Sequence, residues 1–170
     1  EFVDAVLAEV AGRKLGGSAG RIRSIYFGGG TPSKLEPAQL GRLLSGIPRA
    51  LDVGELSTIG ADAELTLEAN PEDVSAGSAA AWRAAGFNRV SLGVQTFDPS
   101  VLQWMHREHS VEAVETAVRE LGRLDVAVAT EAVVAGLAAT RLGAGLDLVL
   151  RAVAEVGATV GQEPLGGGGV

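Results

Sequence analysis

The chain alternates short strand-like stretches with longer stretches of helical spacing. In residues 64–69, Leu65 and Leu67 point to one side of an extended backbone. Thr66 and Glu68 point to the other side. This alternation predicts a strand with one apolar and one polar face, and the polar face ends in a carboxylate at the carboxyl end of the strand.

A second strand, residues 89–95, repeats this arrangement. Its apolar side chains point one way, and Ser91, Gly93 and Gln95 point the other. The carboxyl ends of parallel strands meet at one edge of a sheet, where β/α barrels carry their active sites. We therefore predict that Glu68 and Gln95 lie close together at that edge.

Helical spacing and capping residues predict the elements between the strands. Ser110 precedes an apolar stripe as an N-cap, and Gly86 and Gly122 are placed as helix stops. Strands that alternate with helices indicate an α/β fold with a parallel sheet, which we expect to form one domain over residues 1–160 before a flexible glycine-rich tail, 161–170. The predicted helices are residues 2–14, 37–47, 75–85, 99–105, 111–122 and 146–156, and the predicted strands are 24–27, 64–69, 89–95 and 125–130.

Composition and charge restrict the function. The 170 residues are 46% hydrophobic, which is enough for one core. A formal net charge of -7 argues against nucleic acid as a partner, because no basic stripe is present to neutralise phosphates. The most apolar stretch, 126–150, is interrupted by charged residues, so no membrane span is predicted. No signal peptide is visible, and we expect a cytoplasmic location.

A glycine cluster follows the first predicted strand. Gly28, Gly29 and Gly30 are followed by Thr31 and Pro32. Glycines at the carboxyl end of a strand expose backbone N–H and C=O groups to a ligand. The same cluster is also compatible with a plain turn, so the segment alone leaves both interpretations open.

Four segments in order along residues 22–121 carry a family resemblance. They are the stretches 28–32, 68–71, 86–97 and 107–109. Together the segments resemble the radical S-adenosylmethionine (SAM) enzymes of the oxygen-independent coproporphyrinogen III oxidase group, and 24–27 and 91–97 look more like its heme-chaperone (HemW) branch. The resemblance implies a partial parallel β/α (TIM-like) barrel of the radical SAM type.

The resemblance also implies a SAM site. Gly29, Gly30 and Thr31 match the loop that binds the SAM amino group, and Glu68 balances the positive charge of SAM. Without a ligand, the loop would be a turn and Glu68 an ordinary polar residue at a strand end.

Two further residues complete the predicted site. Gln95 can donate to and accept from ribose hydroxyls, or else it lines the barrel and bonds to neighbouring strands. Arg107 stands where the family pairs an arginine with the SAM carboxylate, although a solvated cation at a helix end is equally compatible with the sequence.

The sequence departs from the family in its cluster ligands. The family holds a [4Fe–4S] cluster with a CxxxCxxC loop, and this chain has no cysteine. We interpret it as a fragment that lacks the first strand and the cluster loop, and we expect that it neither assembles a cluster nor cleaves SAM by itself. The intact parent would act on porphyrinogen or deliver heme. The alternative is a catalytically dead barrel fragment with no ligand of its own. A later inward acid of the family corresponds to Ala132 here.

Heme is a further ligand to test against the sequence. His106 and His109 are three residues apart, which one helix face could present to heme. Glu108 and the following helix cap favour an exposed loop over heme ligation. We expect Trp82 and Trp104 to be core and interface aromatics that pack helices on the barrel.

Overall fold

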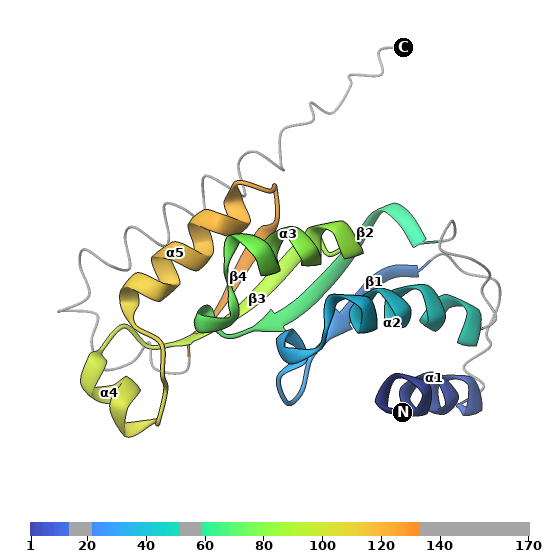
Figure 1. The fold of residues 1–170 in the computed structure, drawn as a ribbon, viewed down its shortest axis with the longest axis horizontal. Coiled ribbons are helices and arrows are strands. Elements are labelled where there is room, and N and C mark those ends of the chain that lie inside the picture. Colours follow the sequence, from blue (N-terminus) through green and yellow to red (C-terminus); the bar gives the residue numbers. More distant parts are fainter. Residues whose placement is uncertain (14–21, 52–58, 133–170) are drawn as a thin grey trace, which may run out of the picture.

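The computed structural model describes residues 1–13, 22–51 and 59–132, and its centre is a parallel sheet (Figure 1). The four strands lie in the order β1-β2-β3-β4, and each adjacent pair is parallel. Sequential parallel order is the arrangement of strands in a β/α barrel. The bounds are β1 Ile22–Phe27, β2 Ile59–Ala69, β3 Arg89–Gln95 and β4 Ala127–Ala132.

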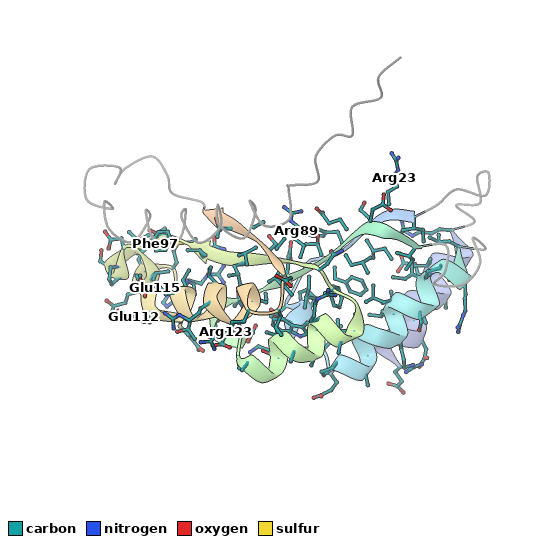
Figure 2. All side chains as sticks on the ribbon, turned by 90° about the horizontal axis from the view of Figure 1, so that it is seen from above. Arg23, Arg89, Phe97, Glu112, Glu115 and Arg123 are labelled. Atoms are coloured by element: carbon teal, nitrogen blue, oxygen red, sulfur yellow. The ribbon has the colours of Figure 1, made fainter. Side chains whose placement is uncertain are left out.

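All the helices except the short one after β3 lie side by side on one face of the sheet (Figures 1 and 2). The short helix lies beyond the end of β3 instead (Figure 1). Figure 2 shows this layering along the sheet, with Arg23 pointing away from the helical side. The helices are α1 Phe2–Gly12, α2 Pro37–Ala50, α3 Ala76–Ala85, α4 Pro99–Trp104 and α5 Val111–Gly122, with short 3₁₀ turns η1 Pro32–Lys34 and η3 Pro71–Asp73. This is the α/β architecture of a partial TIM-like barrel.

The core lies between the sheet and these helices. The alternating apolar residues of β2 and β3 point into it, and Leu67, Val90 and Leu92 are each 0% exposed. From the helices, Leu40 and Trp82 pack against the same layer. The opposite strand positions, including Glu68, therefore face the side where a complete barrel has its interior.

Capping residues set the helix starts as expected. The Ser110 hydroxyl accepts a hydrogen bond from the Ala113 N–H at 3.3 Å, and α5 has the predicted bounds. Gly86 ends α3 with a left-handed φ of 113°. Gly122, in contrast, is the last helical residue of α5, and Asp125 takes the positive φ of 52° instead. This turn moves β4 two residues downstream of the predicted strand.

Several other boundaries differ from the prediction. β2 begins at Ile59, five residues before the predicted strand, because Ile59 pairs with Ile22 across a register irregularity. α2 continues past Pro48 to Ala50, although a proline there removes one helical hydrogen bond and crowds the preceding turn. α1 ends at Gly12, two residues early. The predicted helix 146–156 and the tail 161–170 lie outside the described residues.

Candidate functional site

The glycine loop holds the carboxylate of Glu68 at the carboxyl end of β1 and β2. The Gly29 N–H donates to Glu68 Oε2 at 3.0 Å, and the Tyr26 hydroxyl donates to Glu68 Oε1. Gly29 and Gly30 have φ values of 82° and 54°, which a glycine adopts without strain. A Cβ on Gly28 would lie 2.4 Å from the Tyr26 ring, so the close approach requires glycine there.

The end of β3 turns sharply at Gln95. The Thr96 N–H donates to the Val94 carbonyl at 2.7 Å, which closes a three-residue γ-turn around Gln95. Gln95 has a φ of 63°, and a non-glycine residue held there costs about 1–3 kcal/mol. The turn keeps the Gln95 side chain on the inner side of the sheet, where it is 8% exposed.

Gly93 makes room for two side-chain amides. A Cβ built on Gly93 would lie 3.2 Å from Gln95 Nε2 and 3.4 Å from Asn70 Oδ1. A side chain at this position would press on the Gln95 amide and touch that of Asn70, so the glycine leaves room for both amides beside the end of β3.

Arg107 reaches the same place from the end of α4. His106 adopts a φ of 53°, and the Arg107 N–H donates to the Leu102 carbonyl at 2.9 Å, a helix-ending arrangement of the Schellman type. The Arg107 guanidinium then donates to Asn70 Oδ1 at 3.3 Å. Arg107 is therefore partly buried and directed at the strand ends, which differs from a fully solvated helix-end cation.

These side chains line one polar cleft of about 190 Å³. It has a carboxylate, Glu68, and a guanidinium, Arg107, in its wall. Five of the six predicted site residues line the cleft, and the sixth, Gly29, is hydrogen-bonded to Glu68. The lining residues are Gly30, Thr31, Pro32, Glu68, Ala69, Asn70, Ser91, Gly93, Gln95 and Arg107.

A pair of polar contacts joins the turns that follow β1 and β2. The Ser33 hydroxyl donates to Asp73 Oδ2 at 2.7 Å, and the Lys34 ammonium pairs with the same carboxylate. The hydrogen bond and charge of Asp73 raise the pKa of Lys34 above its ordinary value. The turn after β1 is thereby joined to the turn after β2.

A second, apolar cavity of about 590 Å³ lies on the other side of the glycine loop. The loop residues Gly30 and Thr31 line both cavities. The apolar cavity is also lined by residues of α1, β1 and α2, among them Phe2, Tyr26 and Ile47.

Three contributors to the site were not predicted. Tyr26 lies in the predicted strand 24–27, and its alternation with Phe27 places it on the polar side. Asn70 follows Glu68 by two residues at the same strand end, which was an available signal. Gly93 was noted on the inner face, but its effect on Asn70 depends on a contact between different strands.

Two predictions about aromatic and histidine residues are wrong. His109 is buried, at 5% exposure, because its ring bonds to the Val94 carbonyl. Trp104 is 79% exposed, whereas Trp82 is buried in the core as expected. His106 lies in an exposed loop, as predicted.

The residues of this chain do not fit an iron–sulfur cluster. The sequence contains no cysteine, and [4Fe–4S] clusters of this family are held by thiolates. In the ranges that the structure describes, no group of three His, Cys, Asp or Glu side chains is placed to hold a metal ion. Within the same ranges no helix is long and apolar enough to cross a bilayer.

The fold and cleft define a segment of a β/α barrel with a polar cleft at its carboxyl edge. The family model of the radical SAM superfamily matches residues 4–137. The chain therefore belongs to the radical SAM superfamily, whose intact members use SAM and a [4Fe–4S] cluster.

Curated relatives and a solved structure resemble it over most of the described chain. It is 42% identical over 101 residues to the heme chaperone HemW of Lactococcus lactis, covering 59% of this chain and 25% of that protein. It is 32% identical over 149 residues to the oxygen-independent coproporphyrinogen III oxidase of Bradyrhizobium diazoefficiens, covering 88% of this chain and 31% of that protein. The coproporphyrinogen III oxidase structure from Escherichia coli superposes with a TM-score of 0.65 at 27% identity, covering 91% of this chain and 34% of that one. The chain thus spans a quarter to a third of the length of these relatives.

Proposed function

We propose that this chain is the SAM-binding part of a HemW-like radical SAM protein of heme and porphyrin metabolism. The observation that carries the proposal is the polar cleft, because Glu68 and Arg107 both line it. SAM carries an ammonium, a carboxylate and a sulfonium, so a site for it needs both an anion and a cation.

Each polar group of the cleft has a proposed partner on SAM. The carbonyls of Gly29 and Gly30 and the hydroxyl of Thr31 accept from the methionyl ammonium, and Glu68 supplies the opposite charge. Because Tyr26 and Gly29 already donate to Glu68, its carboxylate is held in place before a ligand arrives.

The other side of the cleft receives the remaining polar groups of SAM. Arg107 pairs with the methionyl carboxylate through two parallel N–H donors. Asn70 accepts from the same guanidinium and so restricts its orientation. Gln95 hydrogen-bonds the ribose hydroxyls with its amide.

The role of this chain is limited to binding and orienting SAM. In intact superfamily members the cluster supplies the electron for SAM cleavage, and this sequence has no thiolate to hold one. We therefore propose that cluster ligation and substrate chemistry belong to residues outside this chain. The predicted cytoplasmic location stays a prediction.

Heme or a porphyrinogen is the proposed substrate class of the intact protein. The support is the names of the relatives, a heme chaperone and a coproporphyrinogen III oxidase. The two histidines of this chain are poor axial ligands as a pair, because the His109 ring is buried and bonded to Val94. If this chain is titrated with hemin and followed by absorbance, we therefore expect no Soret band typical of bis-histidine ligation.

A titration with SAM tests the proposal directly. Amide signals of Gly29, Gly30 and Gln95 in ¹H–¹⁵N spectra should shift in a saturable way, which detects even millimolar affinity. Methioninamide, in which an amide replaces the carboxylate of methionine, should leave the Arg107 signals unchanged. Shifts that are absent from the cleft, or equal to those on α5, would favour the alternative of a dead barrel fragment with no ligand.

A further inference from the structure

His109 is a buried histidine for which the proposed SAM contacts have no use. Its side chain is 0% exposed, and its Nε2 lies 3.0 Å from the Val94 carbonyl oxygen. On the other side of the ring, Nδ1 faces Glu72 Oε2 at 3.5 Å. Because a carbonyl only accepts, Nε2 carries the proton in this contact.

The carbonyl that His109 meets is the one that closes the γ-turn at Gln95. Val94 O accepts from the Thr96 N–H and from His109 Nε2. Gln95 stands between these residues with its left-handed φ of 63°. Such a backbone persists only where surrounding contacts hold it, and the histidine is a contact from another part of the chain.

The same histidine anchors the segment that carries Arg107. Arg107 lies two residues before His109, between the end of α4 and the N-cap Ser110. The segment is joined to the strand ends by two contacts, Arg107 to Asn70 and His109 to Val94. Of the two, the His109 contact is the buried one.

We propose that His109 is a positioning residue that fixes Gln95 and the Arg107 segment together at the SAM cleft. The role of His109 in SAM binding rests on the proposed function, whereas its contact with Val94 does not. His109 touches no ligand. It holds the Val94 carbonyl, which sets the turn at Gln95, and it ties the Arg107 segment to the same point, while Glu72 faces the other ring nitrogen.

The first test needs no ligand. In the full 170-residue chain, a coupling across the hydrogen bond between His109 Nε2 and the Val94 carbonyl carbon should be measurable by NMR. The ¹³Cα and ¹³Cβ shifts of Gln95 should be those of a left-handed residue. Absence of the coupling together with extended-strand shifts at Gln95 in the parent chain would overturn the proposal.

Substitutions separate positioning from general packing. In His109→Leu the ring donor is lost, and the Gln95 shifts should move to extended values. If the leucine variant does not fold, His109→Asn takes its place, because its side chain is too short to reach Val94 and the same shift is expected. His109→Gln places a donor near the Nε2 position and should restore the parent shifts. Gln95 shifts that stay left-handed in the leucine or asparagine variant would refute the positioning role.

The matched control is Leu121→Ala, at the far end of α5. Leu121 is 0% exposed in the core, so this variant lowers stability through packing alone. Its Gln95 shifts should equal those of the parent. If they move as far as in His109→Leu, the effect is a general consequence of destabilisation and the proposal fails.

A ligand measurement then distinguishes this inference from the proposed function. With SAM as the probe, His109→Leu should bind about tenfold more weakly than the parent, His109→Gln within about threefold and Leu121→Ala within about twofold. A parent chain that shows the His109 coupling but no SAM binding contradicts the proposed function and leaves the positioning geometry standing. If the parent and His109→Leu bind SAM with equal affinity, the positioning role of His109 is contradicted and the proposed function is not.

Discussion

The two faces of the same strands follow different physical rules. On the face toward the helices, Leu67, Val90 and Leu92 are completely buried in one continuous apolar layer. On the opposite face of β2 and β3, Glu68 and Gln95 line a polar cleft, and the Glu68 carboxylate accepts hydrogen bonds from Gly29 and Tyr26. Residues one position apart in the chain thus have unrelated environments.

The difference separates the contacts that stabilise this protein from those that shape its polar cleft. Apolar packing is non-directional, so the helical face tolerates small adjustments and mainly determines stability. The polar face depends on directed hydrogen bonds and on backbone conformations such as the left-handed Gln95. Substitutions on the two faces should therefore change different measurements.

The largest expected effect is on the apolar face. Leu92→Ala removes a side chain that is 0% exposed, and we expect a loss of about 2–5 kcal/mol in the free energy of unfolding. Urea denaturation followed by circular dichroism measures it. SAM-induced shifts in the folded protein should stay unchanged, and a loss below about 1 kcal/mol would mean that this layer is loosely packed.

The next effect is on the polar face and on binding. Arg107→Lys replaces a planar fork by a point charge, and we expect SAM binding to weaken by about 1.5–3 kcal/mol. NMR titration measures the affinity, and unfolding should be little changed. The control is Arg83→Lys, since Arg83 lies exposed on α3 and donates to the Leu124 carbonyl. Equal effects of the two substitutions would reduce Arg107 to a surface charge.

Much of the apolar face could be predicted from the sequence because its signals are local. Alternation gave β3 its observed bounds, and the cap at Ser110 with the stripe after it gave those of α5. The inner orientation of Glu68 and Gln95 followed from the same alternation. Their roles as SAM ligands stay predictions.

The rest of the site could not be predicted because it depends on contacts between distant segments. The left-handed φ of Gln95 occurs next to a hydrogen bond between His109 and Val94, which are 15 residues apart. Arg107 meets Asn70 across 37 residues. Neither hydrophobic periodicity nor capping residues indicate contacts between residues so far apart in the sequence. The sequence therefore predicted an exposed loop for His109 and an interface for Trp104.

A smaller effect is expected at the support of Glu68. Tyr26→Phe removes the hydroxyl that donates to Glu68 while keeping the ring, and we expect a loss of about 1 kcal/mol in unfolding free energy. Chemical denaturation at neutral pH measures it. In Tyr26→Phe combined with Glu68→Leu the two losses should be less than additive, because both remove the same bond. Full additivity would contradict the contact.

The smallest effect is at the ion pair between Lys34 and Asp73 and appears only at high pH. Asp73 raises the pKa of Lys34 above its ordinary value of 10.5, so the folded state binds this proton more tightly than the unfolded state. The resulting stabilisation is complete below 10.5 and is lost as the pH rises through the higher pKa of the folded protein. The difference in stability between the parent and Lys34→Met should thus be constant at neutral pH and shrink above that range in urea titrations. Asp73 is the largest cause of this raised pKa, so Asp73→Asn should remove most of the pH dependence of the difference. If the full pH dependence persists in that variant, the pair of Lys34 and Asp73 does not hold the two loops together.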